Sequence, residues 1–118
     1  MAAPDLVNRK CAPCSGTLQP LNAERVRELL TKVPDWKLSA DGKRIGRSWC
    51  VLDFGTGLDF FCRIADVAET EDHHPDLHLA NYRDVTVELW THAAGGLTEN
   101  DFIMAAKISA LEQPALKK

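Results

Sequence analysis

Residues 85–90 alternate between apolar and polar side chains, and this pattern restricts the possible folds more than any other feature of the chain. Val85, Val87 and Leu89 would share one face of an extended strand, while the residues between them and Trp90 would share the other. A strand buried on one face only is typical of an antiparallel sheet. We therefore expect a sheet whose second face meets solvent, or is covered by the N-terminal arm or by a second subunit.

A segment with helical periodicity covers residues 21–33. Its apolar side chains recur at steps of three and four residues, which places them on one face of a helix. Asn22 can serve as the N-cap, because its side-chain oxygen can accept a hydrogen bond from a free amide of the first turn. Pro34 ends this predicted helix, since proline has no amide hydrogen to continue it.

Two further helices are predicted from capping motifs. The second begins near Thr56, where Thr56 and Asp59 form a Thr-x-x-Asp relation, and the third opens with the same relation at residues 98–101. We expect the second helix to end just before Pro75, because proline disfavours helical geometry in the residue that precedes it. The third is expected to run to about residue 112.

Extended segments lie between these helices. Residues 36–39 and 44–53 flank an Asp-Gly pair at 41–42, and glycine accepts the positive φ that a tight hairpin turn requires. Residues 78–82 precede the strand at 85–90, and the two segments form either a second hairpin or one long kinked strand. The expected order is α-β-β-α-β-β-α. This order predicts the α+β class, with a single layer of about four antiparallel strands and three helices on one face.

The chain is long enough for one hydrophobic core. It has 118 residues, of which 45% are hydrophobic and 26% charged, as in an ordinary soluble domain. Residues 1–20 contain three prolines and no apolar period. We therefore expect an irregular N-terminal arm at residues 1–20 and a single domain at residues 21–118.

Charge and hydropathy exclude several classes of partner. Lys and Arg number 14 against 17 Asp and Glu, for a formal net charge of −3, which is unlike the basic surface of a nucleic-acid-binding protein. No stretch approaches the roughly 18 consecutive apolar residues of a membrane span, and the N-terminus lacks the apolar centre of a secretory signal. We expect no direct nucleic-acid binding, no membrane association and a cytoplasmic location, with an organelle or the nucleus left open.

Cys11 and Cys14 form a Cys-x-x-Cys pair in the arm. A structural zinc site usually takes four ligands in two closely spaced pairs, and the chain offers no second pair. A thioredoxin-like redox motif lies between a strand and a helix, which the arm does not provide. We interpret all the cysteines as reduced thiols, with Cys50 and Cys62 as small core residues.

Three of the four histidines lie within residues 73–78, in a strongly acidic part of the chain. Residues 64–82 contain no Lys or Arg and carry the acids Asp66, Glu69, Glu71, Asp72 and Asp76. Nearby carboxylates favour the protonated form of an imidazole, which is the form that donates a proton. This segment is therefore a candidate for acid–base chemistry.

Spacing predicts that several of these groups share one site. Glu69 and His73 are four residues apart, so they would lie on one face of a helix that continues this far. His92 is expected to end the strand that begins near Val85. The end of a helix and the end of a strand can meet at one edge of such a layer, so we expect His73, His74 and His92 around one small cleft.

Three interpretations of the cluster remain. The histidines and Glu69 could bind zinc or ferrous iron, but adjacent histidines rarely both reach one ion. They could act as general acid and base on an organic substrate, or they could be surface histidines near a helix end. We favour acid–base catalysis over surface histidines and both over a metal site, and we interpret Asp66 and Asp76 as solvated acids.

The order and spacing of these residues give a longer pattern. It consists of Glu69, three residues, His73-His74-Pro75, six residues, Tyr82, nine residues, His92, eight residues and Asp101. This pattern resembles that of the pterin-4a-carbinolamine dehydratase family, and the similarity extends over roughly residues 21–112. The chain departs from many members in its N-terminal extension, in Trp90 and in Asn100, which stands where an arginine is often found.

The resemblance implies dehydration of 4a-hydroxytetrahydropterin to quinonoid dihydropterin in tetrahydropterin recycling, without a metal or an organic cofactor.

The catalytic residues that the resemblance implies are His73, His74, His92 and Glu69. His73 and His92 would be the acid and the base, with the two roles unassigned, while His74 would shape the pocket and hydrogen-bond the pterin. Glu69 would orient or charge His73, and Asp101 would anchor the loop of His92. The implied substrate contacts are Asp72, His73, His74, Trp90, Thr91 and His92.

The same resemblance implies a second kind of function. The family includes a dimerisation cofactor of a transcription factor, so a non-catalytic binding module for a protein partner is the alternative to an enzyme. The resemblance also implies a homodimer or homotetramer with the sheet extended across subunits, which an exposed antiparallel edge permits physically.

Overall fold

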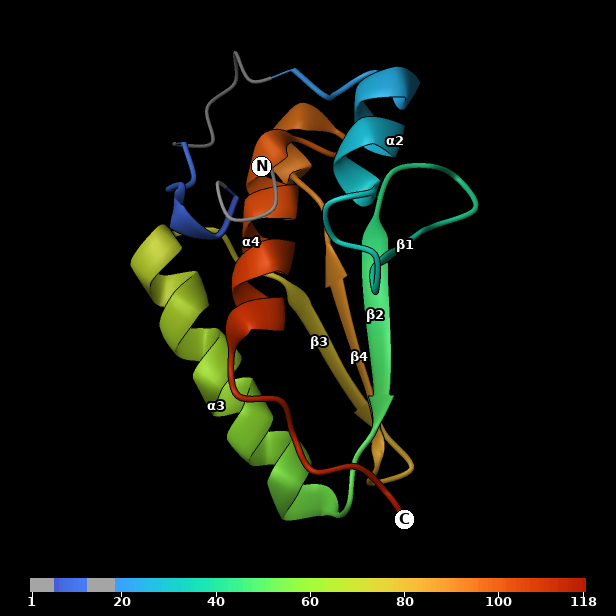
Figure 1. Ribbon diagram of the computed structural model, residues 1–118, viewed down its shortest axis with the longest axis vertical. Helices are drawn as coiled ribbons and strands as arrows, with labels where there is room; N and C mark the ends of the chain where they lie inside the picture. Colours follow the sequence, from blue (N-terminus) through green and yellow to red (C-terminus); the bar gives the residue numbers. More distant parts are fainter. Residues whose placement is uncertain (1–5, 13–18) are drawn as a thin grey trace.

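The computed structural model describes residues 6–12 and 19–118 of the chain. Its elements (Figure 1) are the helices α2 (Ala23–Leu30), α3 (Phe54–Glu71) and α4 (Glu99–Ala110), the short 3-10 helix η1 (His92–Ala94), and the strands β1 (Lys37–Leu38), β2 (Ile45–Cys50), β3 (Asp76–Ala80) and β4 (Asp84–Leu89). The four strands form one sheet in the order β1-β2-β4-β3, with every neighbouring pair antiparallel. The predicted α+β class with a single antiparallel layer is confirmed.

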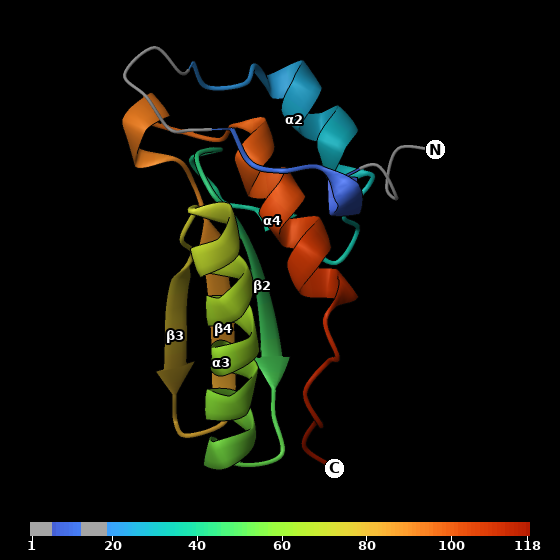
Figure 2. The same cartoon turned by 90° about the vertical axis from the view of Figure 1, so that its left-hand side faces the viewer.

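The helices α3 and α4 lie side by side on one face of this sheet, and α2 lies at the end of the molecule where α4 begins (Figures 1 and 2). The predicted alternation of β4 is confirmed, because Val85, Val87 and Leu89 are fully buried beneath the helices. Phe60 of α3 and Phe102 of α4 are also fully buried in this core. The sheet is therefore buried on its helical face, as the two-residue period predicted.

Two hairpins build the sheet. Gly42 adopts a φ of 73° between β1 and β2, which confirms the turn predicted from the Asp-Gly pair. The question left open for residues 78–90 is also settled, because β3 and β4 are separate strands. They are joined through Asn81 and Tyr82, whose φ values of 49° and 52° are left-handed. This reversal leads the chain from the outer strand β3 back into the centre of the sheet.

The cysteines of β2 and α3 lie outside the core. Cys50 and Cys62 are exposed, so the prediction of two core thiols is wrong. Cys50 follows the buried Trp49 in the alternation of β2 and therefore faces the other side of the sheet. Cys62 lies between the buried Phe60 and Ile64 of α3, on the solvent side of that helix.

Helix α3 differs from its prediction at both ends. It begins at Phe54, and its N-cap is Asp53, whose carboxylate accepts hydrogen bonds from the amide and hydroxyl of Thr56 at 2.8 and 2.7 Å. The predicted start near Thr56, with Asp59 as its capping partner, is therefore wrong. The helix ends at Glu71, earlier than the predicted end just before Pro75, because Asp72 is left-handed with φ 54° and ψ 42°.

The Asp53 cap makes the stability of α3 depend on pH. The pKa of the Asp53 carboxyl lies below its ordinary value, because the hydroxyl and the amide of Thr56 donate hydrogen bonds to the carboxylate. A carboxyl with a lowered folded-state pKa stabilises the fold above its unfolded-state pKa, and this contribution is lost as the pH falls through the folded-state pKa. We expect Asp53→Ala to lower the Tm by a few degrees at neutral pH, and the difference from wild type to shrink in acid.

Thermal melts followed by circular dichroism across the acid range measure this effect. Asp59→Ala is the matched control, because Asp59 is an exposed acid further along the same helix. A Tm difference between wild type and Asp53→Ala that stayed constant with pH would contradict a cap that depends on the charge of Asp53.

The described part of the N-terminal arm packs on the helices. Residues 6–8 form a helical turn, where irregular structure was predicted, and Leu6 is only 2% exposed. Cys14 and the rest of residues 13–18 lie outside the described part of the chain. Within the described residues, no helix has the length and apolar composition needed to cross a membrane.

Candidate active site

A pocket of about 300 Å³ opens where the C-terminal end of α3 meets the end of β4. Its lining consists of Asp72, His73, His74, Trp90, Thr91, His92 and Ala93. The structure thus brings together all the residues proposed from the sequence as substrate contacts, and adds Ala93. In the described part of the chain, a larger depression over β1 and β2 is lined by no histidine.

The left-handed turn at Asp72 directs the two neighbouring histidines to different environments. After α3 ends, the amide of His73 donates to the carbonyl oxygen of Ala68 at 3.2 Å, which folds the chain back against the last helical turn. The side chain of His73 is 5% exposed, whereas that of His74 is 55% exposed. One imidazole of the pocket is therefore buried and its neighbour is open to solvent.

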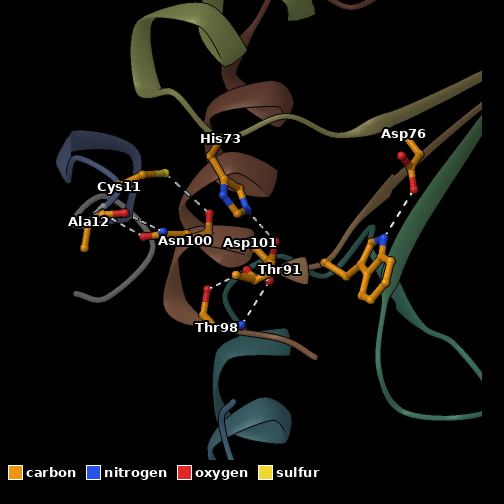
Figure 3. A network of polar contacts seen from close by, with 9 residues as sticks. Cys11, Ala12, His73, Asp76, Thr91, Thr98, Asn100 and Asp101 are labelled. Carbon is orange, nitrogen blue, oxygen red and sulfur yellow. Dashed lines mark hydrogen bonds and ion pairs between the residues drawn. The ribbon is translucent and has the colours of Figure 1, made fainter. Parts of the chain in front are cut away.

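His73 is paired with a buried acid. Its Nε2 lies 2.7 Å from Oδ1 of Asp101, which is 0% exposed (Figure 3). The other oxygen of Asp101 accepts hydrogen bonds from the hydroxyl of Thr91 at 2.8 Å and from the amide of Thr98 at 2.9 Å. A carboxylate can only accept hydrogen bonds, so His73 donates its Nε2–H to Asp101. The acid therefore fixes the orientation of the His73 ring.

The carboxylate partner of His73 is Asp101 and not the predicted Glu69. Glu69 was expected to orient His73, but its Oε2 lies 2.7 Å from Nε2 of His74, and both of these side chains are exposed. The helical spacing of Glu69 and His73 does not hold, because α3 ends at Glu71. The carboxylate that accompanies His73 comes instead from α4. Asp101 thus does more than the predicted anchoring of the His92 loop, although its bond to Thr91 supports that role as well.

His92 was predicted to end a strand, and this prediction is wrong. The strand β4 already ends at Leu89, and His92 begins the short helix η1. Three successive amides, of Ala94, Gly95 and Gly96, point to the carbonyl oxygen of Thr91 at 3.0 to 3.3 Å, and they close a tight loop just after the strand. This loop presents His92 to solvent beside the buried Thr91.

Trp90 supports the ring of His92. The two ring centroids are 3.8 Å apart with 46° between the planes. The indole Nε1 of Trp90 donates to Oδ2 of Asp76 at 3.3 Å, and the guanidinium of Arg44 lies 4.8 Å from the Trp90 ring centroid. Asp76 is therefore a partner of the pocket wall and not only a solvated acid.

Arg44 had not been singled out from the sequence. The signal that identifies it is the strand register, since Ile45 of β2 pairs with Leu89 of β4 and this pairing brings Arg44 close to Trp90.

The remaining histidine lies elsewhere. His78 is on β3, with its Nε2 3.0 Å from Oε1 of Glu88, and it does not line the pocket.

The pocket lining therefore offers three imidazoles, two of which have a carboxylate partner. His73 has a buried carboxylate partner, and His74 has an exposed one in Glu69. Among the described residues, no group of three or more His, Cys, Asp or Glu side chains is placed to hold a metal ion. The chemistry that this arrangement can supply directly is proton transfer to and from a small polar molecule.

Comparisons with known proteins agree on one family. The sequence profile described as Pterin 4 alpha carbinolamine dehydratase matches residues 19–111. The chain is 51% identical over 111 residues to the protein named pterin-4-alpha-carbinolamine dehydratase 2, mitochondrial, of Arabidopsis thaliana; the match covers 92% of this chain and 59% of the longer plant protein. It is 42% identical to a Halorhodospira halophila protein named as a pterin-4-alpha-carbinolamine dehydratase, over 90% of this chain and 96% of the relative.

A solved structure supports the same assignment. The crystal structure of a transcriptional coactivator/pterin dehydratase from Brucella melitensis matches with a TM-score of 0.72 and 36% identity, over 78% of this chain and 97% of the Brucella chain. The profile spans the sheet and all the helices from α2 to α4, including the whole pocket lining. The chain therefore belongs to the pterin 4 alpha carbinolamine dehydratase family, a family of hydro-lyases.

Proposed function

We propose that this protein dehydrates 4a-hydroxytetrahydropterin to quinonoid dihydropterin by general acid–base catalysis, as a step of tetrahydropterin recycling. The observation that carries the proposal is the pocket in which His73, His74 and His92 converge, with His73 held by the buried Asp101. Family membership supports the substrate class, and the pocket supplies the groups that the reaction needs.

The reaction breaks the C4a–O bond and removes one proton from a ring nitrogen, so that water leaves and a carbon–nitrogen double bond forms. Hydroxide is a poor leaving group, so a protonated imidazole must donate to the departing oxygen while a nitrogen lone pair expels it. A second group accepts the proton that the pterin loses. His73 and His92 divide these two roles in our proposal.

The remaining residues bind and orient the substrate. Asp72 and His74 line the pocket and offer hydrogen-bonding groups to the pterin. Thr91 lines the pocket as well, and its hydroxyl donates to Asp101. Glu69 holds His74 through the 2.7 Å contact, so it acts on the pterin through that histidine. Trp90 forms a wall that fixes His92 and gives the planar substrate an aromatic surface.

Stopped-flow absorbance with chemically generated 4a-hydroxytetrahydropterin tests the proposal. We expect the wild-type protein to accelerate dehydration well above the spontaneous rate, and the rate to survive exhaustive chelation, because no step requires a metal ion. A rate equal to the spontaneous one would refute the enzymatic function, and loss of activity on chelation would favour a metal site.

A second candidate is a binding module for a protein partner. The Brucella structure carries the word coactivator in its name, which is the specific observation in its favour. A pure binding module has no use for clustered acid–base groups, so substitutions in the pocket would leave partner binding unchanged.

We also propose a homodimer or homotetramer, because β1 and β3 are the edges of the sheet and edge strands can pair with another chain.

A further inference from the structure

We propose that residues 6–12, here called the arm segment, hold the His73–Asp101 pair in its working geometry by tying the end of α3 to the start of α4. This inference rests on the proposed function only for its effect on catalysis. The matched family region begins at residue 19, so the arm segment lies outside it. The physical basis is a set of hydrogen bonds that end next to both members of the pair.

The first anchor is Asn100, which directly precedes Asp101 in α4. Its Oδ1 accepts from the amide of Ala12 at 2.8 Å, and its Nδ2 donates to the carbonyl oxygen of Ala12 at 2.8 Å. The Sγ of Cys11 also lies 3.7 Å from the carbonyl oxygen of Asn100 (Figure 3). Asn100 is 4% exposed, so its amide group is buried in a two-point contact with the arm backbone.

The second anchor is Glu71, the last residue of α3. Its Oε1 accepts from the amide of Cys11 at 2.8 Å, and its Oε2 lies 3.7 Å from Nζ of Lys107. The side chain of Glu71 is 7% exposed. Lys107 of α4 in turn donates to the carbonyl oxygen of Val7 at 2.7 Å, so the arm is held at a second point along its length.

Together these contacts make a short bridge. The amides of Cys11 and Ala12 are consecutive, and one binds the end of α3 while the other binds the start of α4. Glu71 directly precedes Asp72, whose left-handed geometry aims His73 at Asp101. A displacement of either anchor would therefore move His73 or Asp101 and change the geometry of their 2.7 Å contact. A misplacement of about 1 Å at a proton-transfer group can cost up to about 100-fold in rate.

Asn100→Ala is the primary test, because it removes the side-chain hydrogen bonds to the backbone of Ala12 without altering His73 or Asp101. We expect kcat for dehydration to fall by about tenfold with a smaller change in KM, because proton transfer loses its geometry. Lys10→Ala is the matched control, since Lys10 is exposed on the same arm segment, and it should retain wild-type kinetics.

Glu71 provides a second, independent test. Glu71→Ala removes the acceptor of the Cys11 amide and should lower kcat in the same way as Asn100→Ala. Glu71→Gln keeps an oxygen that can accept from this amide, so it should restore most of the lost rate. Equal loss in the alanine and glutamine variants would contradict the bridge.

The imidazole signals of His73 in nitrogen-15 NMR give a readout that does not depend on activity. We expect them to shift or broaden in Asn100→Ala at temperatures well below its Tm, while those of His78 stay unchanged. Unchanged His73 signals would overturn the proposal, even if the variant had a lower Tm and lost activity through unfolding. If wild type fails to dehydrate the pterin, the proposed function fails, and the NMR comparison still decides whether the arm positions His73.

Discussion

Replacing His73 or His92 with alanine is expected to lower kcat/KM for dehydration by about 100-fold or more, because each variant removes one of the two proton-transfer groups. The two substitutions should differ in structural cost. His73 is buried against Asp101, so its removal leaves a buried carboxylate with one fewer donor, whereas His92 is exposed. Stopped-flow assays at several pH values measure the rate, and circular dichroism verifies that each variant is folded.

His78→Ala is the matched control within the same chain. His78 lies on β3, contacts Glu88 and is not part of the pocket lining, so its loss should leave kcat/KM at the wild-type value. Wild-type activity in a folded His73→Ala or His92→Ala variant would remove that residue from the mechanism. A comparable loss in His78→Ala would show that the assay responds to histidine removal in general and not to the pocket.

Replacing Asp101 with alanine is expected to have the largest effect on stability, on the order of 3 kcal/mol in the free energy of unfolding. The carboxylate is fully buried and accepts from three donors, namely His73 Nε2, the Thr91 hydroxyl and the Thr98 amide. Alanine leaves all three without this acceptor and removes the capping box of α4. Urea unfolding followed by circular dichroism gives the free energy.

Asp66→Ala is the control for the loss of a surface acid, because Asp66 is exposed on α3 and should change stability by less than about 0.5 kcal/mol. Asp101→Asn keeps the size of the side chain but loses its charge, so it should be more stable than Asp101→Ala and still impaired in dehydration. A free energy of unfolding for Asp101→Ala close to that of wild type would contradict a structural role for the buried network.

Several local patterns predicted the structure correctly. Asn22 caps α2 by accepting from the amide of Arg25, and Asp101 completes the capping box with Thr98. The left-handed glycine at position 42 and the buried alternation of β4 also follow the prediction. Each of these features is decided by residues within a few positions of one another, so the sequence contains the whole physical cause.

The predictions failed where two local patterns competed or where distant segments met. The N-cap of α3 is Asp53 and not Thr56, because the Asp53 carboxylate accepts hydrogen bonds from both the amide and the hydroxyl of Thr56. Glu69 was assigned to His73 on helical spacing, and the left-handed Asp72 broke that spacing. Arg44 was missed because only the register between β2 and β4 brings it to Trp90.

The sequence by itself determined the order of helices and strands, the buried face of the sheet and the two short segments that line the pocket. These segments could be recognised because each is continuous, at residues 72–74 and 90–92. Only the tertiary structure decided that Asp101 accompanies His73, across 28 positions of sequence, and that the arm segment binds beside both of them. Such contacts depend on where a helix ends and how two helices pack, and no local spacing encodes either.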